Sequence, residues 1–260
     1  MKRRDFLAAS AAMGTMTLQR SPKPSMKNRQ YLELLHIQPH VGSKKGKVSD
    51  FYRDVAIPAL NRLGIESVGF FNVLFGPNQP SFYVLIPHQT MESVFMTRER
   101  MLHDEKFKRE GKKFLGAELS DAAFVRMERS LLIAFKDMPK VESPKNLLKN
   151  KSRIYELRIY ESHSRLAGKK KIEMFNEGGE IDIFKKTGLR PVFFAETLFG
   201  RLLPNLTYML VFESMDARYK NWDEFRRHPD WLALKAKSEY KDTVSNITDF
   251  ILRPAAFSQI

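Results

Sequence analysis

The chain contains no cysteine, which excludes disulfide bonds, thiolate nucleophiles and cysteine-ligated metal sites. Its histidine, aspartate and glutamate residues show no metal-ligand spacing, so the sequence indicates no metal site. A P-loop and a GxGxxG pattern are also missing, which removes the usual signatures of phosphate and dinucleotide binding. The mild apolar run at residues 7–18 is too short to span a bilayer, so we expect no transmembrane span in the mature protein. The cofactor is therefore unknown, and the sequence leaves open whether the protein is an enzyme.

Basic residues outnumber acidic residues by 44 to 30, which gives a formal net charge of +14. Such an excess raises nucleic acid and acidic membrane surfaces as partners. Acidic residues are interspersed along almost the whole chain, however, and the densest basic runs, at residues 44–47 and 169–171, are short. We therefore interpret the charge as a solvated basic surface and rank nucleic-acid binding last among the functional hypotheses.

The first residues resemble a twin-arginine export signal. Arg3 and Arg4 precede Phe6, Leu7 and a weakly hydrophobic segment, which is the order found in such signals. We predict an export signal and connector over residues 1–28, and a location in the periplasm or cell envelope. The alternative is a frayed leader on a cytosolic protein.

Beyond residue 28 the chain repeats one pattern. Strands are predicted at 30–37, 67–75, 81–86 and 124–135, and helices at 48–63 and 90–115. The same order returns with strands at 154–160, 191–198, 206–212 and 246–252, and helices at 170–187 and 216–240. Phe51 and Phe175 are 124 residues apart, as are Gly64 and Gly188. A period of this length indicates two domains, at residues 29–135 and 152–260, joined by a linker at 136–151.

The order strand, helix, strand, strand, helix, strand is that of the ferredoxin-like α+β fold (βαββαβ). One such unit leaves a sheet face uncovered, and the aromatic strands at 68–75 and 192–199 would be costly to expose. We therefore predict two tandem ferredoxin-like domains that pack sheet to sheet.

The second half resembles the NIPSNAP family. The resemblance lies in YELRIY (155–160), ETLFG (196–200), WDEFRRHPDW (222–231) and ILRPAAFSQ (251–259), and more loosely in residues 56–71 of the first half. It implies the dimeric α/β-barrel superfamily, with both ferredoxin-like domains closing into one intrachain α/β barrel. The family brings no established set of catalytic residues to carry over.

Alternate residues of a strand share a face, which places Glu156, Arg158 and Tyr160 together. The first half has Glu33 in the corresponding place, but Leu35 where the second half has Arg158. We predict that these polar side chains face the space between the sheets and bind a ligand there. A desolvated glutamate would have a raised pKa suited to proton abstraction. The alternative is a Glu–Arg pair that fixes the register at the barrel seam.

Two pairs of surface residues are further ligand-binding candidates. His40 and His163 each follow the first strand of their half, which suggests a symmetric rim at a ligand mouth. In the WDEFRRHPDW segment, Arg226 and His228 would capture an anion near the barrel opening. The alternative for that segment is a kinked amphipathic helix whose aromatic side chains fill the core.

Two hypotheses for function follow. The first is an exported barrel that binds a small organic or anionic ligand, or a protein partner, without turnover. The second is a cofactor-free oxygenase, an isomerase or a haem-handling enzyme that uses the barrel cavity. The sequence does not identify the ligand, and it is compatible with a homo-oligomer.

Overall fold

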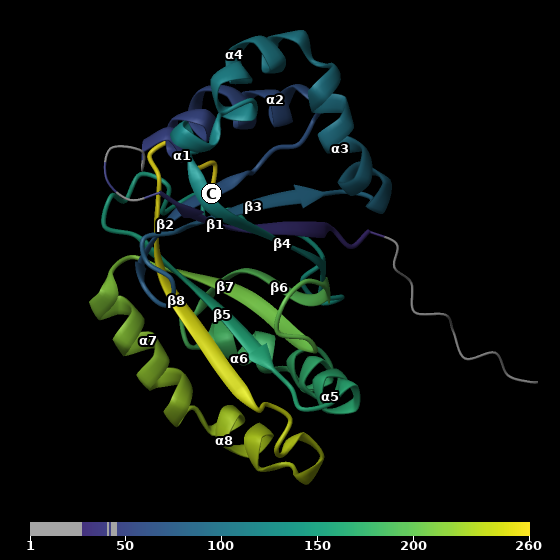
Figure 1. The fold of residues 1–260 in the computed structure, drawn as a ribbon. Coiled ribbons are helices and arrows are strands. Elements are labelled where there is room, and N and C mark those ends of the chain that lie inside the picture. Colours follow the sequence, from purple (N-terminus) through teal and green to yellow (C-terminus); the bar gives the residue numbers. More distant parts are fainter. Residues whose placement is uncertain (1–27, 41, 43–45) are drawn as a thin grey trace, which may run out of the picture.

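The computed structural model describes residues 28–40, 42 and 46–260. Residues 1–27 of the predicted export signal and connector (1–28) lie outside them. In the described part, strands close into one barrel in the order β1-β3-β2-β8-β5-β7-β6-β4, and each neighbouring pair is antiparallel. Helices α1–α4 lie on one side of this barrel and α5–α8 on the other (Figure 1). The predicted α+β class and barrel closure are confirmed.

The strands are β1 (Tyr31–Pro39), β2 (Gly69–Phe75), β3 (Phe82–His88), β4 (Phe124–Ala134), β5 (Ile154–Glu161), β6 (Arg190–Phe199), β7 (Asn205–Phe212) and β8 (Asn246–Pro254). The α-helices are α1 (Gly46–Phe51), α2 (Ile57–Arg62), α3 (Met91–His103), α4 (Glu105–Leu115), α5 (Arg165–Phe175), α6 (Glu180–Lys186), α7 (Met215–Arg227) and α8 (Pro229–Ala236). A π-helical turn (Tyr52–Ala56) joins α1 to α2. Among the described residues, no helix has the length and apolar character needed to cross a membrane.

Every predicted strand is present, but the long predicted helices are interrupted. The helix expected at 90–115 breaks at Asp104, whose Oδ1 accepts a hydrogen bond from the Phe107 amide at 3.0 Å. The helix expected at 216–240 breaks at His228, whose Nδ1 accepts from the Asp230 amide at 3.2 Å. Each residue therefore leaves the helical backbone and caps the helix that follows.

Each half contributes four adjacent strands, β4-β1-β3-β2 from the first and β8-β5-β7-β6 from the second. The inner faces meet in one apolar core that includes Leu34 and Tyr83 of the first half and Leu157 and Met209 of the second. The halves also join edge to edge, because β2 pairs with β8 and β4 pairs with β6. This pairing leaves the barrel with no open sheet edge.

One end of the barrel interior is closed by segments outside the strands. Ile260 and Leu147 are buried in the same inner core. The Gln259 amide donates to the Val68 carbonyl at 3.0 Å, and the Val68 amide donates to Gln259 Oε1 at 2.9 Å. The carboxyl-terminal segment is thereby anchored beside the start of β2.

Candidate functional site

The polar face of β5 lies outside the barrel. Tyr155 and Leu157 belong to the inner core, whereas Tyr160 packs in the cluster beneath the second-half helices. The predicted orientation of Glu156, Arg158 and Tyr160 toward the space between the sheets is therefore wrong. The helix side supplies hydrogen-bonding partners for buried charge, and the apolar interior of the barrel takes the other face of the strand.

Both carboxylate oxygens of Glu156 accept hydrogen bonds from side chains of helix α7. Its side chain is fully buried, Oε1 accepts from Arg218 Nη2 at 2.6 Å, and Oε2 accepts from Trp222 Nε1 at 2.7 Å. Arg218 Nη2 also lies 3.8 Å from Asp249 Oδ2. Because both carboxylate oxygens are bonded, this charge is buried with its partners in place.

Aromatic rings fill the rest of the second-half interface between helices and strands. The guanidinium of Arg158 lies 4.7 Å from the ring centroid of Trp222 and 5.4 Å from that of Tyr160. The Tyr208 hydroxyl donates to the Tyr160 hydroxyl at 2.9 Å. Burial raises the pKa of Tyr160 to about 12, so this hydroxyl is neutral at physiological pH. Arg158 and Tyr160 are thus held in a packed aromatic layer.

Glu33, the first-half counterpart of Glu156, has a looser environment. It is 4% exposed, yet the nearest nitrogen atoms of basic side chains are Arg129 Nε at 3.6 Å and His88 Nε2 at 3.8 Å, beyond normal hydrogen-bond length. Burial raises the pKa of Glu33, and the charge of Arg129 opposes this shift only in part. The first-half carboxylate is therefore buried without close charge pairing.

His88 lies beside Glu33 on the same outer face. Its Nδ1 is 2.9 Å from Ser93 Oγ, and its Nε2 is buried without a hydrogen-bond partner among the described residues. Burial, reinforced by the nearby Arg129, lowers the pKa of His88 to about 4. The imidazole is therefore neutral at pH 7 and does not neutralise Glu33.

Glu33 lines a cavity of about 420 Å³, which we call the Glu33 cavity. It lies between the outer face of the first-half strands and the helices from α1 to α4. Its volume falls within the usual range for small-molecule sites, roughly 300–1,000 Å³. The apolar wall includes Tyr52, Leu60, Ile86, Met101 and Phe114, and the polar lining is Glu33, Thr97, Arg98 and Arg129.

The internal repeat explains why this cavity exists. Helices α3 and α7 are both 13 residues long and begin 124 residues apart. At that spacing, four large rings of the second half are replaced by a smaller or outward-pointing side chain, while other rings, such as Phe175 and Phe194, are matched by Phe51 and Phe70. The rings of Tyr208, Phe184, Phe225 and Trp222 correspond to Val84, Leu60, Met101 and the exposed Arg98. Leu60, Met101 and Arg98 line the cavity at three of these positions, so the loss of large rings there leaves room for it.

The remaining predicted site residues lie elsewhere. His40 is partly exposed and His163 is exposed, and neither lines the Glu33 cavity. Arg226 pairs with Asp223 at 3.3 Å on the surface of α7, while His228 caps α8. The structure thus brings none of these four residues to Glu33.

Sequence reasoning missed His88, Arg129 and Arg98. The signal that would have found two of them is a departure from the repeat, since His88 and Arg98 stand where the second half has Phe212 and Trp222. A polar residue at the position of a buried ring indicates either a changed packing or a cavity. Arg129 gave no such signal, because its approach to Glu33 depends on the pairing of β1 with β4.

The profile of the NIPSNAP family matches residues 155–259. The second half therefore carries a NIPSNAP domain, as its motifs predicted. Among functionally curated proteins, no relative matches the chain.

Several solved structures are similar to all or part of the chain. A proposed monooxygenase from Lactobacillus acidophilus NCFM is 8% identical, with 87% of this chain and 94% of that chain covered and a TM-score of 0.56. A second proposed monooxygenase, from Fusobacterium nucleatum, is 11% identical, with 87% and 92% covered and a TM-score of 0.52. A NIPSNAP-like domain protein from Burkholderia xenovorans is 21% identical, but it covers 42% of this chain and 90% of its own, with a TM-score of 0.38. At these identities the likeness shows the fold alone.

Proposed function

We propose that this protein, in which residues 155–259 form a NIPSNAP domain, is a binding barrel. It holds a small organic ligand in the Glu33 cavity. The observation that supports this most strongly is the contrast between the two helix-covered faces. Rings pack the second-half face, whereas about 420 Å³ beside a buried glutamate stays open in the first half. The apolar side chains that line this open pocket are favourable to cover, and a ligand with an apolar body would remove their surface from water.

The lining defines the chemistry of the ligand. Tyr52, Leu60 and Met101 offer apolar contact to a hydrophobic body. Glu33 accepts a hydrogen bond from a hydroxyl or N–H group, which would supply the close partner that the carboxylate lacks. Arg98 favours an acidic group at the opposite, exposed end of the ligand. We therefore expect an amphipathic molecule with an apolar centre.

A second candidate function is proton abstraction, with Glu33 as the base. The raised pKa of this buried carboxylate favours it, since a general base works best when its pKa approaches the working pH. Once the ligand is identified, the wild type and Glu33→Gln can be incubated with it in D₂O and the ligand followed by mass spectrometry. Exchange catalysed by the wild type and lost in the variant supports catalysis, and no exchange with either leaves ligand binding as the function.

Native mass spectrometry of the full chain purified from its own cells tests the ligand directly. A retained mass that solvent extraction releases supports the proposal. Binding of anilinonaphthalene sulfonate, which has an apolar aromatic body and an anionic group, provides an independent probe of the cavity. We expect its fluorescence to rise with the folded wild type.

A variant that fills the Glu33 cavity tests whether anilinonaphthalene sulfonate binds there. Arg98→Trp restores the ring that the second half has at Trp222, and should abolish the fluorescence gain. The matched control is Arg100→Trp, because Arg100 lies on the same helix, is about half exposed and is not part of the cavity lining. Equal binding by both variants would overturn the assignment of the cavity.

We also propose that the halves are tandem ferredoxin-like units and that the chain is exported through its twin-arginine-like segment. The strand orders β4-β1-β3-β2 and β8-β5-β7-β6 support the first, and the order of residues 3–18 supports the second. Sequencing the amino terminus of envelope-purified protein tests export. An intact Met1 in that fraction would contradict cleavage.

A further inference from the structure

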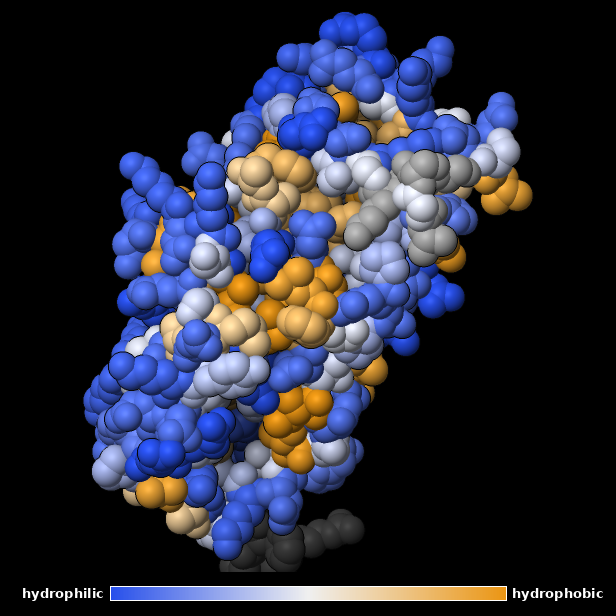
Figure 2. All heavy atoms as spheres, turned by 90° about the vertical axis from the view of Figure 1, so that its left-hand side faces the viewer, coloured by the Kyte–Doolittle hydropathy of each residue, from blue (hydrophilic) through white to orange (hydrophobic). Residues whose placement is uncertain are grey.

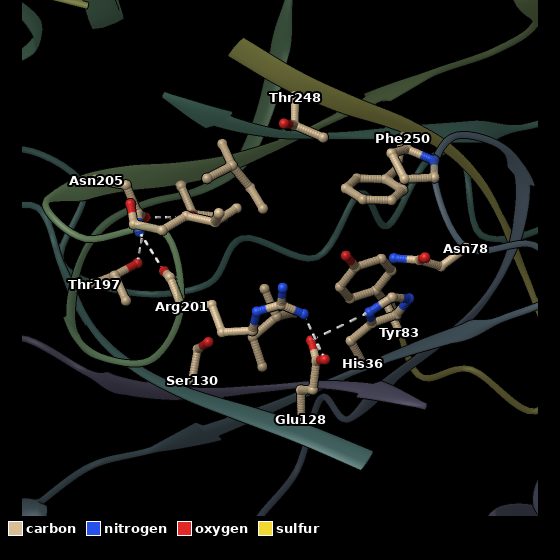
Figure 3. Close-up of a pocket in the computed structure, with 15 residues that line it drawn as sticks. His36, Asn78, Tyr83, Glu128, Ser130, Thr197, Arg201, Asn205, Thr248 and Phe250 are labelled. Carbon is tan, nitrogen blue, oxygen red and sulfur yellow. Dashed lines mark hydrogen bonds and ion pairs between the residues drawn. The ribbon is translucent and has the colours of Figure 1, made fainter. Parts of the chain in front are cut away.

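A second cavity, of about 180 Å³, lies inside the barrel at the end opposite Ile260 (Figure 3). It is lined by side chains of both halves, among them His36 of β1, Tyr83 of β3, Glu128 of β4 and Phe250 of β8. We call it the inner cavity. Because side chains alternate along β1, His36 points into the barrel while Glu33 points out, so the two cavities lie on opposite faces of the same strand.

One ion pair spans the inner cavity. Arg201 Nη1, from the turn between β6 and β7, donates to Glu128 Oε1 at 2.6 Å. Figure 3 shows the guanidinium and the carboxylate directed toward each other, with the His36 ring on the other side of Glu128. His36 Nδ1 lies 3.8 Å from Glu128 Oε2. The lining residues thus carry one positive and one negative charge, contributed by different halves.

His36, Tyr83 and Phe250 form an aromatic corner, in which the Phe250 ring is tilted by 58° to the His36 ring and by 67° to the Tyr83 ring. The His36 ring stacks on Tyr83 with centroids 4.5 Å apart and planes 9° from parallel, and Phe250 lies 6.1 Å from His36. His36 is 8% exposed, and its Nε2 is buried without a hydrogen-bond partner among the described residues. Burial lowers the pKa of His36 despite the neighbouring Glu128, so the ring is neutral at pH 7.

The turn that carries Arg201 is fixed in place. Thr197 and Thr207 donate from their hydroxyls to Asn205 Oδ1 at 2.6 and 3.1 Å. Asn205 Nδ2 donates in turn to the carbonyls of Arg201 and Leu202, both at 3.0 Å. The inner cavity is therefore shaped before a ligand arrives, which lowers the ordering cost of binding.

We infer that the inner cavity is a second ligand site, which takes a small, planar, uncharged molecule carrying an amide or hydroxyl group. Its volume equals that of about six waters and is below the range for drug-sized ligands. The Glu128–Arg201 pair balances its own charge, with the Arg201 side chain 62% and the Glu128 side chain 22% exposed, so the site offers a charged ligand no unpaired counter-ion. An amide can donate to Glu128 and accept from Arg201, while its planar body packs into the aromatic corner formed by His36, Tyr83 and Phe250.

Three ring compounds of similar shape and different charge test this class. The full chain is labelled with ¹³C in its six histidines, and the His36 signal is assigned from a His36→Gln variant. Neutral benzamide should shift the His36 signal, whereas benzoate and benzamidine should bind about tenfold more weakly or not at all. No shift with benzamide, or equal shifts with all three probes, would overturn the proposal.

Removing one member of the ion pair should change the charge preference. Arg201→Met leaves Glu128 unbalanced and should favour cationic benzamidine, while Glu128→Gln leaves Arg201 unbalanced and should favour benzoate. If both variants keep the order of affinities seen in the wild type, the ion pair does not select the ligand and the inference fails.

Variants that fill one cavity or the other test where benzamide binds. Thr248→Phe enlarges a side chain that lines the inner cavity and should abolish the benzamide shift. Ile247→Phe is the matched control, because Ile247 is the neighbouring residue and is 45% exposed. Arg98→Trp, which fills the Glu33 cavity, should leave benzamide binding unchanged. Loss of binding in Arg98→Trp would show that benzamide occupies the other cavity.

Discussion

The two halves of the molecule place the same carboxylate in different surroundings. Glu156 is bonded through both oxygens to Arg218 and Trp222 of α7. Glu33 occupies the matching position on β1, but no cation lies closer than 3.6 Å among the ion pairs of the described residues. One copy of the fold therefore uses the position to anchor a helix, and the other leaves it facing a cavity.

The strand opposite each glutamate repeats this contrast. Asp249 of β8 pairs in register with Arg158, whereas Arg129 of β4 pairs in register with Leu35. The second half thus has several charges in mutual contact beneath α7. The first half has one carboxylate, one arginine and a neutral His88. We expect the second-half face to provide stability and the first-half face to provide binding.

The largest expected difference is between Trp222→Ala and Arg98→Ala. Trp222 is 7% exposed and donates to Glu156, so its removal creates a void and leaves a buried oxygen unpaired. We expect a loss of about 3–5 kcal/mol in the free energy of unfolding. Arg98 is exposed, and its truncation should change stability by less than about 0.5 kcal/mol. Urea unfolding of both variants measures this, and equal losses would remove the distinction between the halves.

A smaller difference is expected between Glu156→Gln and Glu33→Gln. The first variant replaces the charged partner of Arg218 by a neutral amide of the same shape, at a cost of about 1.5–3 kcal/mol. The second should be neutral or stabilising at pH 7. Because the folded pKa of Glu33 is raised, its contribution to stability falls as the pH rises above the ordinary glutamate value. Unfolding at pH 7 compares the two, and a large loss in Glu33→Gln would show that this carboxylate is firmly paired.

The third prediction concerns the loss of folding stability at acidic pH. The pKa of His88 is lowered from 6.5 to about 4, so between these values the unfolded chain binds a proton that the folded chain does not. Stability is therefore lost as the pH falls through this window, by about 2 kcal/mol at pH 5 for this one group. His88→Phe, which copies Phe212 of the second half, should reduce the difference between unfolding free energies at pH 7.5 and pH 5.

The third prediction compares the same variant at two pH values. Any cost of packing the new phenylalanine is present at both values and cancels in the difference. His36 has a lowered pKa too and keeps its share of the acid loss in the variant. Glu33, Arg129 and Ser93 are the polar groups that face His88, and none of them is changed. An unaltered pH dependence in His88→Phe would show that His88 is protonated in the folded protein at pH 5.

The positions of the strands along the chain were predictable, because alternation and turn residues are local signals and the pattern occurs twice. The orientation of β1 and β5 was not predictable from alternation alone. Both faces of β5 are buried, and the sequence does not show that Trp222 and Arg218 lie within reach of Glu156. Glu33 was a ligand-binding candidate and remains one, but it was expected in the space between the sheets, whereas it faces the helices. Its cavity lies where Leu60 and Met101 stand in place of second-half rings, and the comparison of the two halves position by position, not alternation along one strand, reveals that difference.

The smallest expected effect concerns the two residues at the helix breaks, Asp104 and His228. Here the first-half residue is expected to contribute more to stability than its second-half counterpart. Asp104 accepts from the Phe107 amide at 3.0 Å and also pairs with Arg62, and these contacts lower its pKa. His228, the matching residue 124 positions later, accepts only a longer bond, at 3.2 Å, from the Asp230 amide. A carboxylate caps a helix better than an imidazole does, since it also interacts favourably with the helix dipole. Asp104→Ala should therefore lower the melting temperature more than His228→Ala does, and calorimetry at pH 7 measures both. If His228→Ala had the larger effect, tighter packing would govern even the exposed caps of the second half.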